Sequence, residues 1–561
     1  MFGSDRKTTG SYYTPPQLVQ QLIKTALEPV IEDKLKNLTP QASSLQGNGE
    51  IQSLSPSRGE VWREVISAKE KALLSLKIVD PACGSGHFLL AAARRIGKEL
   101  AKVRTGEAEP GSEPLKLAIR DVIQNCIYGV DLNPLAVDLC KVALWIEGFP
   151  GKLPLNFLDH RIKCGNSLVG VLDINCLDEG IPDEAFKAVT GDDKKLSSQL
   201  KKRNKKERET DNQGQLSIFG GLETERTHYA ESARELGDIP EATPQQVKEK
   251  QARYQQTRKD SGWWRDYSAC NLWTAAFFMP LTEQNLQLLP TTAALTQLLR
   301  GNLSTQEIKD AANKLAEEKH FFHWCLEFPE VFEQGGFDCV LGNPPWERIK
   351  LQEKEFFASQ SAEIANAINK AAREKLIKEL PNKNPELAQA FEDAKHDAEA
   401  QGKFIRESGR FPLTAVGDIN TYAIFAETTR KLISSDGRLG VIVPTGIATD
   451  ATTSEFFRNL VESGNLKGIT GFKNEKFIFT GIEHVVTFCT VVIGGSQLHF
   501  DEMKFLWLAY TFQEANDLNR QVVLKSSDFK LLNPNTFTCP IFRTCTDAEL
   551  TKKIYQAVPI L

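Results

Sequence analysis

The chain has 561 residues, of which 41% are hydrophobic and 25% are charged, a composition typical of soluble globular proteins. This length exceeds what one core usually serves, so two or three domains are expected. No apolar run approaches the roughly 18 residues that span a membrane, and the N-terminus lacks a signal-peptide core, so we expect a cytoplasmic protein without membrane contact. Eleven cysteines without a Cys-x-x-Cys pair argue against a zinc site or a disulfide framework, and no metal is expected. The net charge of −5 requires any nucleic-acid surface to be locally basic.

The first motif along the chain lies between a short apolar run at 76–79 and a helical pattern that starts near Leu89. A strand, a Gly-x-Gly turn and a helix N-terminus form a nucleotide cradle, because glycines let the backbone approach a ligand closely. The third glycine of a dinucleotide fingerprint is absent, and the acidic residue precedes the glycines, which favours a cationic ligand without phosphate. The motif consists of Asp80, Pro81, Ala82, Cys83, Gly84, Ser85, Gly86, His87 and Phe88.

Two further strand ends follow this motif. The run 127–130 ends at Asp131, which precedes Leu132, Asn133 and a helix expected from about Leu135 to Trp145. An acid at the carboxyl end of a strand can accept hydrogen bonds from both hydroxyls of a ribose. A third short strand at 162–164 leads to Asn166 and Ser167, which could contact the edge of an adenine ring. Three successive strand ends are therefore expected to line one ligand.

The region 176–325 interrupts this alternation of strands and helices. Its charge run from Lys194 to Arg208 is expected to be a mobile, solvated loop, with a position over nucleic acid as the alternative. The segment from Gln215 to Phe219 is similar to the short peptides that dock into the bacterial sliding clamp. A tether onto the protein's own surface is the favoured interpretation of that segment.

The most informative motif, Gly342-Asn343-Pro344-Pro345-Trp346, ends the apolar run 337–341. Proline fixes φ and removes an N–H donor, so the turn presents the Asn343 side-chain amide and the Pro344 carbonyl in one direction. Trp346 offers a flat face, so the exocyclic amine of a stacked heterocycle fits between the two acceptors. The pattern indicates a site of amine methylation. The alternative is a turn that only ends the strand and has no functional role.

The residue types also suggest how such a site works. Hydrogen bonds from the amine to Asn343 Oδ1 and to the Pro344 carbonyl would favour a pyramidal nitrogen and stabilise its developing positive charge. A base inside a duplex must first be flipped out. The chain has no Pro-Cys dipeptide, which argues against the enzymes that methylate a cytosine ring carbon.

After Trp346, helices are expected at 353–403, and the sheet pattern resumes from 414 to 494 with a buried strand at 485–493.

In their order these motifs resemble the S-adenosylmethionine-dependent adenine DNA methyltransferases of the amino gamma class. Such enzymes occur in restriction-modification systems and in phage-defence systems of the BREX type. The resemblance covers most of the chain, and Thr9 to Pro16 resembles the family's N-terminal cofactor motif. It implies an α/β, Rossmann-like fold whose mostly parallel seven-stranded sheet has helices on both faces and is interrupted by helical insertions. It also implies that S-adenosylmethionine is the cofactor, and that the partners are double-stranded DNA and a specificity or restriction subunit.

The resemblance also assigns roles to individual residues. The implied catalytic residues are Asn343, Pro344, Pro345 and Trp346, and the implied target-base pocket consists of Trp346, Tyr422 and Phe479. Asn166 is a departure, because many relatives carry Asp there. The implied cofactor-binding residues are Tyr13, Thr14, Asp80, Pro81, Ala82, Cys83, Gly84, Gly86, His87, Phe88, Asp131, Leu132, Asn133, Asn166, Ser167 and Asn343.

This assignment divides the chain into successive segments. The last of them is too short for a separate groove-reading domain, so we expect a truncated or split enzyme that needs another polypeptide for recognition. Two alternatives remain: methylation of RNA or of a protein glutamine amide, and an inactive remnant that only binds cofactor. The expected segments are an N-terminal cofactor helix (1–45), a linker (46–69), the cofactor-binding half (70–175), a charged insertion (176–325), the catalytic strand and loop (326–350), a helical insertion (351–412), the target-base half (413–500) and an incomplete C-terminal region (501–561).

Overall fold

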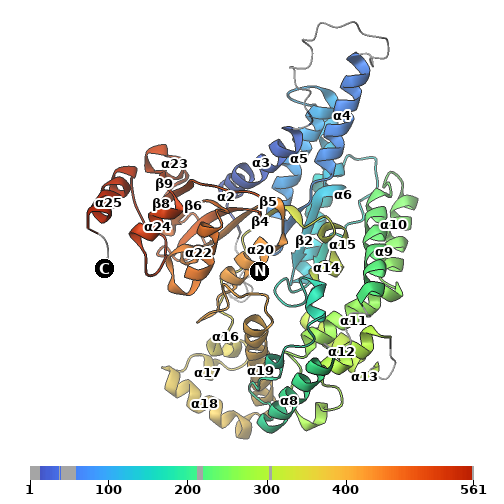
Figure 1. Cartoon of the computed structure of the whole chain (residues 1–561), viewed down its shortest axis with the longest axis vertical. Helices are drawn as coiled ribbons and strands as arrows, with labels where there is room; N and C mark the ends of the chain where they lie inside the picture. Colours follow the sequence, from blue (N-terminus) through green and yellow to red (C-terminus); the bar gives the residue numbers. More distant parts are fainter. Residues whose placement is uncertain (1–12, 37, 39–57, 212–218, 302–305, 559–561) are drawn as a thin grey trace.

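The computed structural model describes residues 13–36, 38, 58–211, 219–301 and 306–558. Nine strands of the described chain form one sheet in the order β3-β2-β1-β4-β5-β7-β6-β8-β9 (Figure 1). Five of the eight strand pairs are parallel, and the pairs β5–β7, β6–β7 and β8–β9 are antiparallel, so the sheet is mixed. The strands are β1 Ile78–Asp80, β2 Ile127–Asp131, β3 Ile162–Cys164, β4 Phe337–Gly342, β5 Ile433–Pro444, β6 Leu466–Lys473, β7 Thr487–Gly494, β8 Met503–Ala509 and β9 Val522–Leu524.

The expected seven-stranded sheet is wrong in its number of strands. The two additional strands, β8 and β9, come from the segment 501–561, which we expected to begin a separate region. Strand β8 pairs in parallel with β6, because an unpaired edge there would leave backbone donors and acceptors without partners. The strand expected at 485–493 begins later, at Thr487, and Val485 is exposed.

Side chains of the central strands alternate between two hydrophobic cores, one on each face of the sheet. Ile78 and Ile127 belong to the first core, and their neighbours Val79 and Tyr128 belong to the second. This period of two is the geometry of a pleated strand. The apolar runs on β1 and β2 are therefore buried on both faces, as expected for strands inside a parallel sheet.

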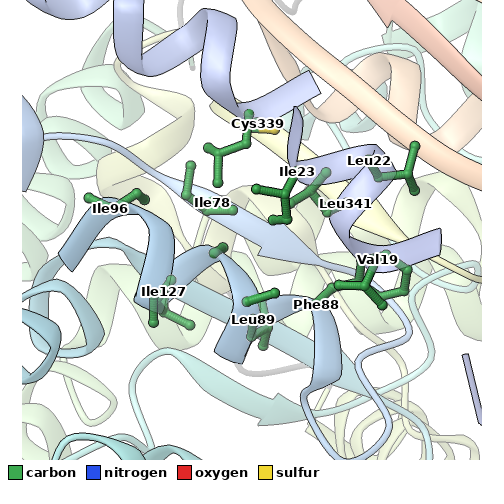
Figure 2. Packing of buried hydrophobic residues seen from close by; sticks show 14 of the residues in the cluster. Val19, Leu22, Ile23, Ile78, Phe88, Leu89, Ile96, Ile127, Cys339 and Leu341 are labelled. Carbon is green, nitrogen blue, oxygen red and sulfur yellow. The ribbon is translucent and has the colours of Figure 1, made fainter. Parts of the chain in front are cut away.

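The first face is covered by the N-terminal helices and by the helices that follow β1 and β2. Figure 2 shows Val19, Leu22 and Ile23 packing over Leu341 of β4. The approach is so close that a Cβ atom at Gly440 would lie 2.8 Å from the Ala26 Cβ atom. The elements on this face are α2 Pro16–Leu22, the π-helix η1 Ile23–Leu27, α3 Glu28–Lys36, α4 Arg58–Leu74, α5 His87–Thr105, α6 Ser112–Cys126 and α7 Pro134–Glu147.

The second face is covered by helices from the later part of the chain. Phe456 and Phe457 are fully or almost fully buried there, and they pack with aromatic residues of the C-terminal strands. The helices are α14 Trp324–Glu327, α15 Pro329–Phe332, α20 Thr421–Leu432, α21 Gly446–Thr449, α22 Ser454–Glu462, α24 Ser526–Leu532 and α25 Cys545–Ala557, while α23 Phe512–Ala515 contacts the first core.

The two insertions are helical; in Figure 1 most of their helices lie below the sheet, while α9 and α10 stand to its right. The charge run at 194–208, expected to be a mobile loop, is part of helix α8, because Leu196, Leu200 and Asn204 recur every four residues and are buried. Residues Gln215 to Ile218 of the clamp-like segment lie outside the described residues, as do Thr9 to Tyr12. The insertion helices are α8 Lys194–Asp211, α9 Phe219–Asp238, α10 Pro244–Thr257, α11 Ser261–Ala275, α12 Thr292–Leu299, α13 Gln306–Lys319, α16 Glu353–Ala358, α17 Ala362–Ala365, α18 Lys370–Lys383 and α19 Pro385–Glu407.

No helix in the described ranges is both long enough and apolar enough to cross a membrane.

The packing of α2 over the sheet yields a stability prediction. Leu22 is fully buried, so Leu22→Ala should lower the free energy of unfolding by about 2–5 kcal/mol through lost burial and the cavity left behind. Leu135→Ala is the matched control, because Leu135 is 70% exposed and should lose less than about 0.5 kcal/mol. Urea unfolding followed by circular dichroism measures both variants. Equal losses would contradict the placement of α2 in the core.

Candidate active site

A cleft of about 1820 Å³ opens at the carboxyl ends of β1, β2, β3 and β4. Helices α16 and α19 and the end of α13 contribute its other walls. The cleft does not include Gly86, Pro344, Tyr422 or Phe479. It brings together the predicted site residues Tyr13, Thr14, Asp80, Pro81, Ala82, Cys83, Gly84, His87, Phe88, Asp131, Leu132, Asn133, Asn166, Ser167, Asn343, Pro345 and Trp346.

Asp80 ends β1 and lies deep in the cleft. It is 2% exposed, and its Oδ1 accepts a hydrogen bond of 3.0 Å from the Ala82 N–H. Burial raises the pKa of Asp80 to about 8, and the negative charge of Asp131 adds to the rise. A Cβ atom at position 342 would lie 2.8 Å from Asp80 Oδ1, so Gly342 leaves the room that this carboxyl group needs.

Asp131 ends β2 beside the Gly-rich turn. Its Oδ2 accepts a hydrogen bond of 2.8 Å from the Gly84 N–H, and its Oδ1 accepts one of 2.9 Å from the Asn133 N–H. Burial raises the pKa of Asp131, while these two hydrogen bonds oppose the rise. A carboxylate offers about four acceptor positions, so each oxygen retains capacity for a ligand donor. The arrangement suits a pair of neighbouring hydroxyl groups.

Asn166 and Ser167 both follow β3, but their side chains form different hydrogen bonds. The Ser167 hydroxyl is buried and donates to the Pro81 carbonyl at 2.6 Å, so it joins two loops of the site. Asn166 Oδ1 accepts from the Leu168 N–H at 3.1 Å, within its own turn. Asn166 is thus the better placed of the two to contact a ligand.

Asn343 follows β4 and carries an unusual buried oxygen atom. Its Nδ2 donates to the Thr14 hydroxyl at 3.1 Å, which orients the amide. Its Oδ1 is buried and has no hydrogen-bond partner among the described residues. An unpaired buried acceptor costs about 1–3 kcal/mol, so such an atom is a candidate contact for a ligand donor. Thr14, predicted to contact the cofactor, lines the cleft and also orients Asn343.

Trp346 is held in place by aromatic packing from behind. Its ring stacks on Phe488 with a centroid distance of 6.1 Å and meets Phe479 edge to face at 5.8 Å. Phe479 is only 2% exposed, so it supports Trp346 from the core rather than facing the cleft, and Tyr422 is 6% exposed. Trp346 is the one member of the predicted base pocket that reaches the cleft.

Sequence reasoning missed several cleft residues. The Thr421 hydroxyl donates to the Pro345 carbonyl at 2.6 Å and accepts from the Glu347 N–H at 2.8 Å, so helix α20 holds the turn at 343–347 in place. Glu347 Oε1 is also buried without a partner in the described part of the chain, and burial raises the pKa of Glu347. The only signal for Thr421 was its position in the motif around Tyr422.

The expected basic character of the cleft is weak. Lys319, Arg348 and Lys350 line it, together with Glu318 and Glu347. Two of these cations are paired elsewhere: Lys319 with Asp397 at 2.5 Å and Arg348 with Asp418 at 3.3 Å. No cluster of three or more metal-binding side chains occurs in the ranges that the structure describes.

Comparison with known families agrees with this geometry. Residues 125–391 match the Eco57I restriction-modification methylase family, and residues 59–164 match the DNA-methyltransferase domain of MmeI. Together the two matches cover residues 59–391, and both are to methyltransferase domains of restriction-modification proteins. The resemblance drawn from the sequence motifs to this class of proteins is confirmed.

Two curated proteins show the relationship at the level of whole sequences. A Methanocaldococcus jannaschii protein, described as a type II restriction enzyme and methyltransferase, is 24% identical over 375 residues, which are 61% of this chain and 28% of that protein. The adenine-specific methyltransferase PglX of Streptomyces coelicolor is 37% identical over 81 residues, which are 14% of this chain and 6% of PglX. The chain therefore spans less than a third of either relative.

Solved structures of restriction-modification enzymes also match. The Type IIL enzyme MmeI in complex with DNA is 13% identical, with a TM-score of 0.34, over 94% of this chain and 41% of that chain. A modification subunit of a type I restriction enzyme from Vibrio vulnificus is 10% identical, with a TM-score of 0.31, over 85% of this chain and 63% of that subunit.

The raised pKa of Asp80 predicts a specific pH dependence of stability. Its folded-state pKa of about 8 exceeds the ordinary value near 3.9, so its contribution to stability is complete below pH 3.9 and is lost as the pH rises to 8. At pH 8, Asp80→Asn should therefore be more stable than the unmodified protein, by on the order of a few kcal/mol. Thermal unfolding at pH 6, 7 and 8 measures the difference.

Asp138→Asn serves as the control for this experiment, because the Asp138 side chain is 73% exposed on α7. Its stability should follow that of the unmodified protein at every pH. A difference between Asp80→Asn and the unmodified protein that does not grow with pH would mean that Asp80 is not the buried titrating group.

Proposed function

We propose that this chain transfers a methyl group from S-adenosylmethionine to the exocyclic amine of an adenine base in DNA. The observation that carries the proposal is the buried Asn343 Oδ1, which has no hydrogen-bond partner among the described residues and lines the same cleft as Trp346. An acceptor in this state favours a ligand with an N–H donor, and the adjacent indole ring favours a flat one. The exocyclic amine of a stacked base has both properties.

The amide orientation supports a role in transition-state stabilisation. Because Thr14 Oγ1 accepts from Asn343 Nδ2, the oxygen and not the NH₂ group is left for the substrate. On the sequence motif we assign the Pro344 carbonyl as the second acceptor for the amine, although Pro344 itself does not line the cleft. These two acceptors stabilise the positive charge that develops on the nitrogen as the carbon–nitrogen bond forms. Thr421 and Phe488 keep the turn and the indole ring rigid, so no reorganisation is needed during reaction.

The residues at the other end of the cleft fit the proposed cofactor. Methyltransferases of this family generally use S-adenosylmethionine, which when bound supplies an activated methyl group on a positively charged sulfur. Asp131 has acceptor capacity for the two ribose hydroxyls. Asp80 provides a carboxyl group for the cationic methionine portion, and the turn at Gly84 and Gly86, with φ of 51° and 88°, has the left-handed geometry that glycine adopts without strain.

DNA as the substrate is supported by the family descriptions and by the names of the relatives. Adenine is supported by PglX, which is described as adenine-specific. A duplex must release its base into the cleft, and Trp346 is available to stack on the flipped base. Because the matched families and the curated relative are described as restriction-modification proteins, we further propose that a specificity or restriction subunit is a partner of this chain.

The direct test is transfer of tritiated methyl groups from S-adenosylmethionine to duplex DNA, RNA or protein, followed by digestion and identification of the labelled product. N6-methyladenine in DNA is expected. Label in RNA or in glutamine would redirect the proposal to another acceptor. Cofactor binding without transfer to any of the three would mean that the chain is only a binding remnant.

The geometry of Asp131 predicts the effect of its removal on cofactor affinity. Asp131→Ala should weaken S-adenosylmethionine binding by about 1.5–3 kcal/mol, roughly a 10- to 150-fold rise in Kd, because two charge-assisted hydrogen bonds are lost. Isothermal titration calorimetry measures this change, with Asp138→Ala as the control on the same helix–strand unit. Unchanged affinity in a folded Asp131→Ala protein would remove Asp131 from the cofactor site.

The geometry of Asn343 predicts a loss of turnover without a loss of binding. Asn343→Ala should reduce methyl transfer about a hundredfold or more at unchanged S-adenosylmethionine affinity, because one acceptor for the developing charge is gone. Thr14→Val should give a smaller loss, because the amide remains but is no longer oriented. Asn366→Ala, at an exposed helix end, should have no effect. Full activity of Asn343→Ala would place the methyl acceptor elsewhere.

A further inference from the structure

The loop after β3, residues 165–171, is held in place by the first insertion. We call it the adenine loop. The N–H groups of Phe322 and Trp324 donate to the carbonyls of Val169 and Val171, at 2.8 Å and 3.0 Å. The Val171 N–H donates in turn to His323 Nδ1 at 2.9 Å. The end of the insertion thus runs alongside the adenine loop and is bonded to it through the backbone.

The second insertion holds the same loop from another direction, through Arg410. Its Nη1 donates to the carbonyls of Leu168 and Gly170 at 3.2 Å and 2.7 Å, and its Nη2 donates to that of Ser167 at 3.3 Å. Arg410 is 8% exposed and does not line the cleft. Within the described ranges its guanidinium forms no ion pair with a carboxylate, so the three carbonyls are its main compensation for burial.

This compensation matters because the guanidinium keeps its charge. Burial lowers the pKa of Arg410 to about 10, which still leaves it protonated at neutral pH. A buried cation that hydrogen-bonds three carbonyls of one four-residue turn, those of Ser167, Leu168 and Gly170, is a strong constraint on their orientation. Gly170 has a φ of 134°, and a Cβ atom there would lie 2.3 Å from the Phe322 carbonyl oxygen, so the loop is also closely packed from the opposite side.

The constraint decides which atom of Asn166 is offered to a ligand. Asn166 lines the cleft, and its Oδ1 is engaged by the Leu168 N–H, two residues further along the same turn. Its Nδ2 therefore remains as a hydrogen-bond donor at the cleft. A donor at this position selects a base with an acceptor, whereas an aspartate would select one with a donor.

We propose that Arg410 is a positioning residue for cofactor selection, and that it holds the adenine loop so that Asn166 Nδ2 donates to ring nitrogen N1 of the cofactor's adenine. This inference rests on the proposed function, because it requires an adenosyl cofactor in the cleft. Adenine N1 accepts a hydrogen bond, but N1 of hypoxanthine carries a hydrogen and cannot. The enzyme should therefore discriminate against an inosyl cofactor, since a site built around one hydrogen bond rejects the ligand that leaves it unpaired.

The test compares two product analogues, S-adenosylhomocysteine and S-inosylhomocysteine, by isothermal titration calorimetry. The unmodified protein should bind the adenosyl compound about tenfold or more tightly than the inosyl compound. In Arg410→Met the affinity for the adenosyl compound should fall about tenfold or more, and the ratio of the two affinities should approach one. Arg410→Lys should recover part of the ratio. A general loss of stability would weaken both ligands equally and leave the ratio unchanged.

Arg406→Met is the matched control, because Arg406 is exposed near the end of α19, four residues before Arg410, and donates to the Gly417 carbonyl instead of the adenine loop. It should retain the affinities of the unmodified protein. If near-UV circular dichroism shows that Arg410→Met does not fold, Arg410→Gln is measured in its place with the same two outcomes.

The results separate the inference from the proposed function. A folded Arg410→Met or Arg410→Gln protein with the unmodified ratio overturns the role of Arg410. An unmodified protein that binds both analogues equally overturns the Asn166 contact. Failure of the unmodified protein to bind S-adenosylhomocysteine at all would instead refute the proposed function.

Discussion

The parallel pairing of β1 with both β2 and β4 is the constraint on which the site depends. Because these strands run in the same direction, their carboxyl ends meet at one edge of the sheet. The register pairs Ile78 with both Ile127 and Cys339, so the residues that follow the strands emerge at similar heights. Asp80, Asp131 and Asn343, which lie far apart in sequence, therefore line one cleft.

The first insertion is fastened beside β3 by the buried carboxylate of Glu241. Lys250 of α10 pairs with Glu241 at 2.8 Å, and both side chains are fully buried. The other Glu241 oxygen accepts from Asn156 and from the Phe157 N–H, which precede β3. Buried pairs of this kind contribute little net stability, but removing one partner leaves a costly unpaired charge. Lys250 keeps the Glu241 carboxylate charged and in place, and the hydrogen bonds to it from Asn156 and Phe157 fix where the first insertion lies beside β3.

Several polar groups in the site are retained at an energetic cost. Burial opposes ionisation of Asp80, and Asn343 Oδ1 receives no hydrogen bond from the part of the chain that the structure describes. Such groups destabilise an empty site and become favourable when a ligand with the complementary charge or donor is bound. Beside these groups, the rings of Trp346, Phe479 and Phe488 contact one another, which holds the Trp346 indole at the cleft.

The sequence by itself determined the central strands, the order of the motifs and most of the cleft residues. Short-range patterns are sufficient for these features: apolar runs that end in Asp80, Asp131 and Asn343 mark strand ends, and the turn chemistry of glycine and proline is local. The tertiary structure decided what depends on distant partners. Strand β8 pairs with the edge of β6 and extends the sheet to β9. The charge run at 194–208 forms a helix because one of its faces packs against the rest of the insertion. Long-range contacts also decided that Trp346, and not Phe479, faces the cleft. They likewise decided which carbonyls accept hydrogen bonds from Arg410. Such contacts join segments more than a hundred residues apart, and local sequence patterns do not encode them.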